Sequence, residues 1–309
     1  MSAIASASTS PTDQTADPEV ATTAAAGDVN ASALDSIPVS FIVTGFGPFA
    51  GVPDNPTSSL IRRLRADGAG AEPLADADDG GETSGRVRVD AGARAIRETH
   101  IIETSAEDVR RRLDEIYASS NAAVGSGSAA PVVAVALHLG VNYRGTKFQL
   151  EKCAYNDATF RVPDERGYQP RRECIIESEA DCGRVTNASS SHEWGKCFET
   201  ELDVHKLCEE LKKTEERVTV SRDPGRFVCN YVYCLSLDKC RSANVANTTV
   251  DDINGAEGAR EGEKKAKKAG HYSLFLHVPP FNVIAEDEQY AFLLMVLEAI
   301  GRQLSSGDE

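Results

Sequence analysis

Short apolar runs and longer amphipathic stretches alternate along most of the chain. The run at 131–139 (PVVAVALHL) is continuous and rich in β-branched residues, which is typical of a strand covered on both faces. Further strands are predicted at 39–44, 100–102, 217–221 and 272–278, and extended structure at 148–162. Apolar spacing and start signals predict helices at 57–65, 105–116, 202–211, 227–237 and 287–304. This alternation predicts an α/β fold with a mostly parallel sheet between two layers of helices.

Several segments lack this apolar pattern. Residues 1–36 consist mainly of Ala, Ser, Thr and Asp, and they contain too few large apolar groups to offset the entropy of ordering the chain. This tail is therefore predicted to be disordered, and the domain is expected to span 37–309. A loop is predicted at 119–130, and longer loop insertions are predicted near 66–87, 171–195 and 241–270.

The composition excludes several classes of protein. The 309 residues carry a formal net charge of −15, which disfavours binding to nucleic acid or to anionic lipid, because both need a surplus of cations. No run approaches the roughly 20 apolar residues of a membrane-spanning helix. The chain does not start with a basic segment followed by an apolar one, so no secretory signal is predicted and a cytoplasmic setting is expected.

The eight cysteines form no recognisable disulfide or metal pattern. No two of them are spaced as C-x-x-C. A set of His192, Cys197, His205 and Cys208 can be imagined as ligands, but its spacing matches no common zinc site. No metal site is therefore predicted.

A cysteine and two histidines stand near the ends of predicted strands. Cys229 follows the turn at 223–225, where a helix is expected to begin, and backbone N–H groups and the helix dipole at such a position stabilise a thiolate. His277 ends an apolar strand before two prolines, where its imidazole is a suitable base for a thiol. The plainer interpretations are an inert buried cysteine and a hydrogen-bonded core histidine. His138, at the end of another strand, is a rival base.

Two further segments offer groups that such a pair would need. Glu151 is a carboxylate that could orient an imidazole, although a surface ion pair with Lys152 is an equal alternative. The turn at 44–49 (TGFGPF) presents Phe46 and Phe49, and it lacks the full G-x-G-x-x-G pattern of a dinucleotide site. Its plainer interpretation is a glycine-rich turn with two core phenylalanines. These residues alone indicate a cytosolic α/β protein, with a thiol hydrolase as one candidate.

Together these segments resemble the pyroglutamyl peptidase I family of cysteine peptidases, also called pyrrolidone carboxyl peptidases. The matching sequences are VTGFGPFAGVPDNPTS at 43–58, ALHLGV at 136–141, LEKCAYNDATFRVPDERGYQP at 150–170, SRDPGRFVCNYVYC at 221–234 and FLHVPP at 275–280. They follow the family's order across about 38–305. The resemblance implies a single three-layer αβα domain with a twisted, mostly parallel sheet, in agreement with the alternation of elements.

The resemblance also implies roles for individual residues. Cys229 corresponds to the nucleophile, His277 to the general base and Glu151 to the acidic third member. Asp164 and Arg161 correspond to residues that support the site. The implied substrate-binding residues are Phe46, Phe49, Phe227 and Val228, and Asn55 is expected to be a turn or cap residue rather than a catalyst.

The implied activity is removal of an N-terminal pyroglutamyl residue from peptides by a thiolate, through a thioester and without a metal or cofactor. Peptides with that terminus are the expected partners, and a homo-oligomer is left open. The alternatives are a catalytically inactive peptide-binding homologue and another αβα hydrolase or phosphorylase. The chain has Leu-Gly-Val at 139–141 where bacterial members often carry Val-Gly-Gln, so a side-chain contact from that loop is not implied here.

Overall fold

The structure is a computed structural model, and it describes most of the predicted domain. The described residues are 39–49, 51–68, 84–85, 89–91, 94–124, 133–177, 194–254 and 270–305. The predicted disordered tail at 1–36 lies outside them, as do large parts of the three predicted insertions. Those assignments therefore stay predictions.

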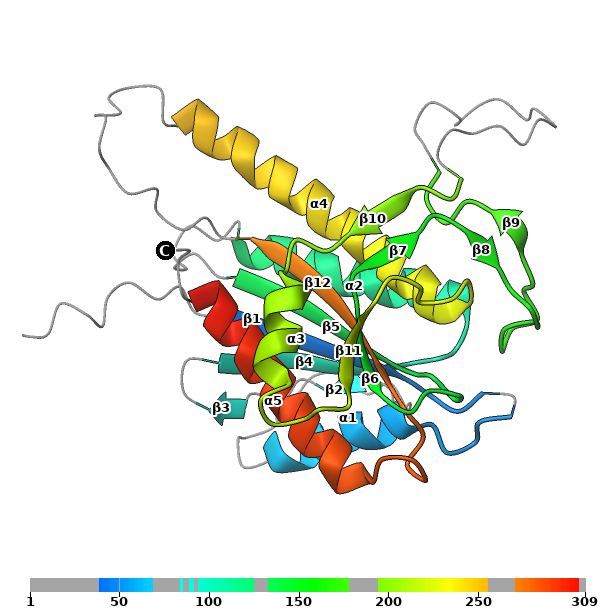
Figure 1. Cartoon of the computed structure of the whole chain (residues 1–309). Helices are drawn as coiled ribbons and strands as arrows, with labels where there is room; N and C mark the ends of the chain where they lie inside the picture. The colour runs from blue at the N-terminus through cyan, green and yellow to red at the C-terminus, as the bar shows by residue number, and fades with distance from the viewer. Residues whose placement is uncertain are drawn as a thin grey trace, which may run out of the picture. The chain divides into compact units, whose positions relative to one another are not determined.

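A mostly parallel sheet forms the centre of the unit that spans Ser36–Glu309 (Figure 1). Its described strands are β1 (Val39–Phe46), β2 (Ser84–Gly85), β3 (Val89–Ala91), β4 (Arg94–Ile102), β5 (Val133–Val141), β6 (Phe148–Glu151), β11 (Val218–Ser221) and β12 (His271–Val278). The strand order is β11-β6-β12-β5-β1-β4-β2, with β3 also paired to β4. Strands β4, β1, β5 and β12 run parallel, as do β11 and β6, whereas β6 is antiparallel to β12. The predicted α/β class is confirmed.

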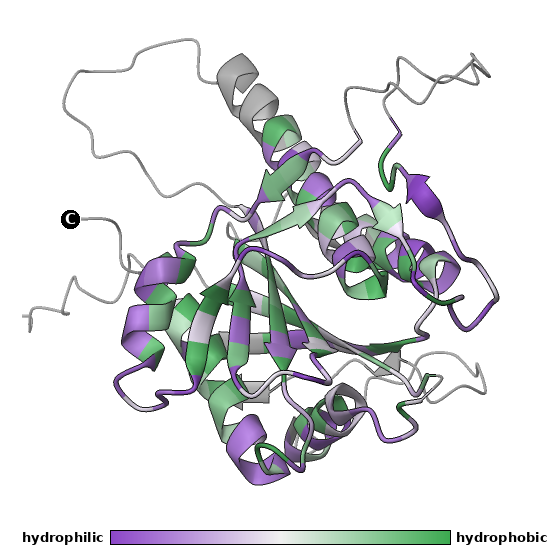
Figure 2. Cartoon of the chain, turned by 45° about the vertical axis from the view of Figure 1, so that its right-hand side comes forward, coloured by the Kyte–Doolittle hydropathy of each residue, from purple (hydrophilic) through white to green (hydrophobic). Residues whose placement is uncertain are grey.

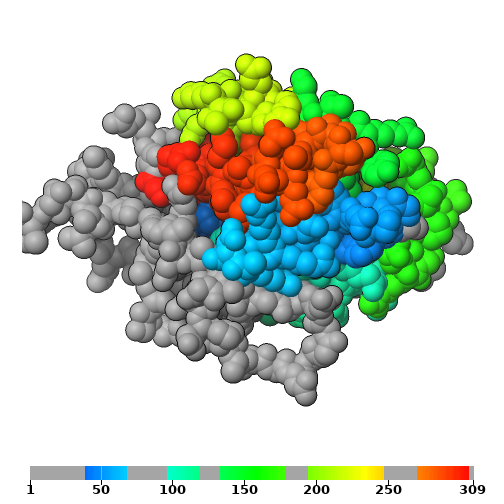
Figure 3. Space-filling model, turned by 90° about the horizontal axis from the view of Figure 1, so that it is seen from below, coloured from blue at the N-terminus to red at the C-terminus, as the bar shows by residue number. Residues whose placement is uncertain are grey.

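Helices cover both faces of this sheet. They are α1 (Pro56–Gly68), α2 (Ala106–Val124), α3 (Val204–Leu211), α4 (Val228–Asn254) and α5 (Glu286–Ser305). Helices α1, α3 and α5 lie on one face, with α5 between the other two in Figure 3, and α2 and α4 lie on the other face. Each layer packs an apolar cluster against the sheet, and the strands between them are largely apolar, as Figure 2 shows. Burial of both faces explains why the run in β5 is continuous rather than alternating.

Two small antiparallel sheets lie beside the main one. They are formed by β7 (Cys153–Tyr155) with β10 (Cys197–Glu199) and by β8 (Ala158–Thr159) with β9 (Arg171–Glu173). The extended structure predicted at 148–162 is therefore divided among three sheets, because the chain leaves the main sheet after Glu151.

Two helices extend beyond their predicted ends. Helix α2 continues to Val124 through part of the predicted loop at 119–130, and α4 continues to Asn254 into the predicted insertion at 241–270. In α4 the Asn244 side chain donates to the backbone oxygen of His271 at 3.0 Å and accepts from its N–H at 2.8 Å. This contact with the start of β12 supports a helical stretch whose polar composition suggested a loop.

None of the helices in the described ranges is long and apolar enough to cross a membrane.

Candidate active site

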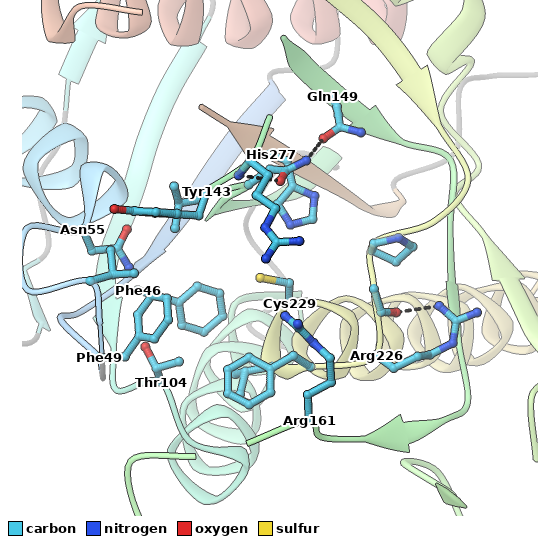
Figure 4. A pocket seen from close by; sticks show the side chains of 18 of the residues that line it. Phe46, Phe49, Asn55, Thr104, Tyr143, Gln149, Arg161, Arg226, Cys229 and His277 are labelled. Atoms are coloured by element: carbon cyan, nitrogen blue, oxygen red, sulfur yellow. Dashed lines mark hydrogen bonds between the residues drawn. The ribbon is translucent and has the colours of Figure 1, made fainter. Parts of the chain in front are cut away.

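A cavity of about 760 Å³ lies at the carboxyl ends of β1, β5 and β12. This is the edge of an α/β sheet where ligands usually bind. Figure 4 shows Phe46 and Phe49 on one side of Cys229 and His277 above it. The structure thus brings together residues that the sequence placed on three separate segments.

Cys229 is the second residue of α4, so it lies in the first turn of that helix. The preceding turn at 223–225 ends at Gly225, whose φ of 78° is a left-handed conformation that glycine adopts without strain. The first N–H groups of a helix have no partner within the helix, and together with the helix dipole they favour negative charge nearby. The half-buried thiol of Cys229 is therefore in a position that stabilises a thiolate or an oxyanion.

His277 connects Cys229 to a buried carboxylate. Its Nδ1 lies 2.8 Å from Oε1 of Glu151, and the ring also hydrogen-bonds the Cys229 thiol. Because a carboxylate only accepts, Nδ1 carries a proton and the other ring nitrogen is left for the thiol. Burial lowers the pKa of His277, but the hydrogen bonds and charges of Cys229 and Glu151 outweigh it and raise the pKa to about 9.

Glu151 ends β6 and is fully buried. Its Oε2 has no hydrogen-bond partner among the described residues, while its backbone oxygen accepts from the Tyr233 hydroxyl at 2.8 Å. Lys152 pairs instead with Glu199 at 3.6 Å. The alternative of a surface ion pair between Glu151 and Lys152 is therefore wrong.

A glycine in β5 leaves room for the Cys229 thiol beside His277. Gly140 lies opposite His277 in the pairing of β5 with β12. A Cβ at this position would lie 2.5 Å from Cζ of Phe275 and 3.0 Å from Sγ of Cys229. Distances this short leave no room for a side chain beside the thiol.

The turn after β1 holds two aromatic rings in the cavity wall. Thr57 anchors it, because its hydroxyl accepts from the backbone N–H of Phe46 at 2.9 Å. Asn55 is 1% exposed and donates to the backbone oxygen of Gly47 at 3.0 Å, while its Oδ1 accepts from the N–H of Thr57 at 3.1 Å. Asn55 thus has the contacts of the predicted turn and cap residue. Phe46 is buried and Phe49 is half-buried.

The segment before Cys229 also lines the cavity. Val228 is buried, and the Phe227 ring packs edge-on against Phe160 at 4.8 Å. These contacts hold the start of α4 against the segment that follows β8 (Figure 1).

The two predicted supporting residues have different surroundings. Arg161 lines the cavity near Cys229 (Figure 4). Asp164 does not line it, and its carboxylate instead accepts from the backbone N–H groups of Ala106, Arg166 and Tyr168 at 2.9, 3.0 and 2.9 Å. Asp164 therefore joins the Arg161 segment to the first turn of α2.

The rival base, His138, lies inside the fold rather than in the cavity wall. It is fully buried, with Nδ1 2.8 Å from the Thr44 hydroxyl and Nε2 2.8 Å from the Ser236 hydroxyl. Burial, with a smaller effect from His100, lowers the pKa of His138 to about 3. His138 is therefore the hydrogen-bonded core histidine, and His277 is the imidazole at the thiol.

The remaining cysteines described by the structure differ in burial. Cys153, Cys208, Cys234 and Cys240 are buried, Cys174 is half-buried and Cys197 is exposed. Burial and the neighbouring Cys153 raise the pKa of Cys197 to about 11. The described residues contain no cluster of three or more possible metal ligands, and His192 lies outside them.

Sequence reasoning missed part of the cavity wall. The missed residues include Val52, Thr104, Asn142, Tyr143, Arg144, Gln149 and Arg226. Several lie in or beside the turn between β5 and β6, where Asn142 donates to Gln149 at 2.6 Å. The one sequence signal for this turn was that it follows the carboxyl end of a central strand, where ligand sites of α/β sheets usually lie.

No family model matches the chain, but individual proteins do. The chain is 24% identical over 261 residues to the pyrrolidone-carboxylate peptidase of Enterococcus faecalis, a match that covers 84% of this chain and 86% of the relative. It is also 24% identical over 197 residues to the pyrrolidone-carboxylate peptidase of Lactobacillus johnsonii, covering 63% of this chain and 67% of that protein.

Solved structures have the same fold. The pyroglutamyl peptidase I of Bacillus amyloliquefaciens superposes with a TM-score of 0.55 at 18% identity, covering 87% of this chain and 99% of that chain. The pyrrolidone carboxyl peptidase of Fervidobacterium islandicum gives 0.53 at 20% identity, covering 85% and 99%. The predicted resemblance is confirmed, and the chain is related in sequence and in fold to the pyroglutamyl peptidase I family.

Proposed function

We propose that the chain is a cysteine peptidase that hydrolyses an N-terminal pyroglutamyl residue from peptides. The observation that carries this proposal is the position of His277, between the Cys229 thiol and the buried carboxylate of Glu151. A nucleophile, a base and a group that orients the base are the components of this class of catalyst. The names of the relatives and the family motifs support the choice of substrate.

The first chemical step is attack of sulfur on the pyroglutamyl carbonyl. His277 accepts the thiol proton of Cys229, and Glu151 stabilises the resulting imidazolium. The thiolate adds to the carbonyl carbon, and the backbone N–H groups at the start of α4 are suitably placed to stabilise the oxyanion. His277 then protonates the leaving amine as the C–N bond breaks, which leaves a thioester on Cys229.

The second step releases pyroglutamate. Water gives a proton to His277 and attacks the thioester carbonyl. Collapse of this intermediate breaks the C–S bond and returns the proton to Cys229. Each turnover therefore consumes one water molecule and requires no oxidant or metal.

Recognition in this proposal depends on the shape and the polar groups of the lactam ring. A pyroglutamyl terminus has no free amine, so a charged handle is absent. Phe46 and Phe49 form an aromatic wall for the flat ring near Cys229, with Phe227 and Val228 beside the nucleophile. A prolyl residue lacks the ring carbonyl, and the donor that would bind it is left unpaired at a cost of about 1–3 kcal/mol.

The complete set of Cys229, His277 and Glu151 favours a catalyst over an inactive peptide-binding homologue. A phosphorylase would have no use for a thiol paired with an imidazole. We also place the activity in the cytoplasm, which the free thiols of the buried Cys153, Cys208, Cys234 and Cys240 support.

The test is release of a fluorophore from a pyroglutamyl amide by the purified chain, with the prolyl amide as the competing substrate. We expect turnover of the pyroglutamyl amide alone. Cys229→Ala and His277→Ala should each lower kcat/KM by about a thousandfold or more. Cys197→Ser, which removes an exposed thiol outside the cavity, is the matched control and should stay active. Binding without turnover by the wild type would instead support the inactive homologue.

A further inference from the structure

The charged side chains of the cavity are unevenly distributed. Arg144, Arg161 and Arg226 line it, whereas Asp223 is the sole carboxylate in its described lining. The chain as a whole has a net charge of −15. A cationic cavity in an acidic protein is therefore a local feature that composition does not explain.

One of the three arginines is neutralised within the protein. Arg226 lies 2.8 Å from Asp223 and 3.3 Å from Asp157, and its guanidinium stacks on the Tyr155 ring at 4.0 Å. The only carboxylate in the described lining, Asp223, is therefore already paired with Arg226. Arg226 and Asp223 together therefore add no net charge to the cavity.

The other two arginines have no such partner. Among the described residues, the guanidinium groups of Arg144 and Arg161 make no ion pair and no hydrogen bond, and both side chains are exposed. Arg144 comes from the turn between β5 and β6, and Arg161 from the segment after β8. Two separate parts of the chain thus bring free positive charge to one cavity.

The position of these charges relative to the thiol suggests what they bind. Phe46 and Phe49 lie to one side of Cys229, while the Arg161 side chain lies below it and reaches toward the thiol (Figure 4). If the pyroglutamyl ring lies against the aromatic side, the leaving part of the peptide extends from the scissile bond toward the remaining cavity wall. A guanidinium is well suited to bind a carboxylate there, because it offers a planar pair of N–H donors.

We propose that Arg144 and Arg161 form a binding site for a carboxylate in the leaving portion of the substrate. This inference rests on the proposed peptidase activity and names its preferred substrates as acidic pyroglutamyl peptides. The carboxylate belongs either to an Asp or Glu side chain directly after the scissile bond or to the C-terminus of a pyroglutamyl dipeptide. A cationic cavity also raises the local concentration of anionic substrates.

The experiment compares two matched pairs of substrates by kcat/KM, measured from the pyroglutamate released. The first pair is pyroglutamyl-Glu-amide against pyroglutamyl-Gln-amide, and the second is pyroglutamyl-Ala with a free carboxylate against its amide. We expect a preference of about fivefold for the acid in at least one pair, as expected for partly exposed charge pairs. A preference in the first pair places the carboxylate on the side chain, and one in the second pair places it at the C-terminus.

Charge variants test whether the arginines cause this preference. Arg144→Gln should lower the ratio of acid to neutral substrate toward one, and Arg144→Glu should reverse it. Arg144→Lys should retain most of the ratio. Lys147→Gln removes the same charge from the same turn outside the described cavity lining, so it should leave the ratio unchanged. Salt near 1 M should reduce the wild-type ratio through screening.

Two results overturn the proposal and separate it from the proposed function. If the neutral substrates are cleaved and both acids are no better, the carboxylate site is wrong while the peptidase activity stands. If none of the four substrates is cleaved, the peptidase activity fails and the carboxylate site fails with it. A preference that persists unchanged in Arg144→Glu also overturns the assignment.

Discussion

A buried carboxylate contributes, after the Cys229 thiol, to the raised pKa of His277 in the proposed catalytic pair. Glu151 is fully buried, one of its oxygens binds His277, and the other has no partner in the described part of the chain. A negative charge in such surroundings acts strongly on the adjacent imidazole because little solvent screens it. The folded protein therefore holds the His277 proton more tightly than an unfolded chain does.

Replacing Glu151 tests this effect through the pH dependence of activity. In the wild type, kcat/KM for a pyroglutamyl amide should fall on the alkaline side as His277 loses its proton, with a pKa of about 9. Glu151→Gln keeps the shape but removes the charge, so this alkaline limb should move to lower pH and kcat should fall. The measurement is a pH–rate profile for both proteins. Glu199→Gln, at an exposed carboxylate, is the control; an unmoved limb in Glu151→Gln would refute the electrostatic role.

The raised pKa of His277 also makes the stability of the fold depend on pH. His277 has a pKa of about 9 in the folded protein, against an ordinary value of 6.5. Its interactions therefore stabilise the fold fully below about pH 6.5, and this contribution is lost as the pH rises through about 9.

At the scale of elements, the predicted strands were the reliable part of the fold. The apolar runs in β1, β5 and β12 are continuous because helices cover both faces of the sheet. A continuous apolar run can be recognised from the sequence alone. The antiparallel direction of β6 was not predictable, because it depends on which strand lies beside it in space. The length of α4 was also missed, since its last turns are polar and depend in part on the contact between Asn244 and His271.

The residues of the candidate site also differ in whether the sequence alone could indicate them. Cys229, His277 and Glu151 could be selected as candidates because each lies in a short motif at a strand end or a helix start, and the structure places them in contact. Arg144 was not, because no feature of its local sequence indicates that its turn faces the thiol. Asp164 belongs to a matched motif, yet its contacts with α2 could be known only from the folded chain.

The packing of β5 against α4 and β12 gives a prediction about Gly140. Gly140→Ala would place a methyl group 2.5 Å from the Phe275 ring and 3.0 Å from the Cys229 sulfur. We expect the free energy of unfolding to fall by about 1–3 kcal/mol, and kcat to fall because the thiol is displaced. Urea unfolding and the pyroglutamyl amide assay measure the two effects.

Gly47 provides the matched control for this substitution. A methyl group there would be 3.7 Å from its nearest neighbour, which is an ordinary contact. Gly47→Ala should therefore change the free energy of unfolding much less. Equal stability of Gly140→Ala and the wild type would mean that the close approach is not a constraint.

At the scale of the whole molecule, a buried network joins the sheet to one helical layer. His138 of β5 contacts Thr44 of β1 and Ser236 of α4, and the Ser236 hydroxyl donates to Ser273 of β12 at 2.8 Å and lies 2.8 Å from the Tyr117 hydroxyl of α2. The network includes a residue of α4, the helix that carries Cys229, without reaching the described cavity lining. Its neutral histidine links the stability of the fold to pH.

We predict that this histidine contributes to acid unfolding. The pKa of His138 is about 3 in the folded protein, against an ordinary 6.5, so the unfolded chain takes up this proton first as the pH falls. Stability should therefore decline between about pH 6.5 and 3. His138→Gln should be less stable at pH 7, by about 1–3 kcal/mol, but should show a flatter decline. Urea unfolding from pH 7 to 4 measures both slopes.

The exposed His205 supplies the comparison for that experiment. His205→Gln should follow the wild-type slope, because this substitution leaves the buried network around His138 intact. Parallel slopes for His138→Gln and the wild type would remove the network from the explanation of acid sensitivity.

The burial of the cysteines has a consequence for covalent inhibitors. Four of the seven described thiols are inside the core, and the exposed Cys197 is held protonated at neutral pH by its raised pKa. Electrophiles react with thiolates, so exposure alone does not make Cys197 a competing target. Among the described thiols, Cys229 is the one that lines the cavity and hydrogen-bonds an imidazole, so a lactam ring would direct an attached mild electrophile to it. Selective inactivation through Cys229 then depends on ring recognition rather than on the strength of the electrophile.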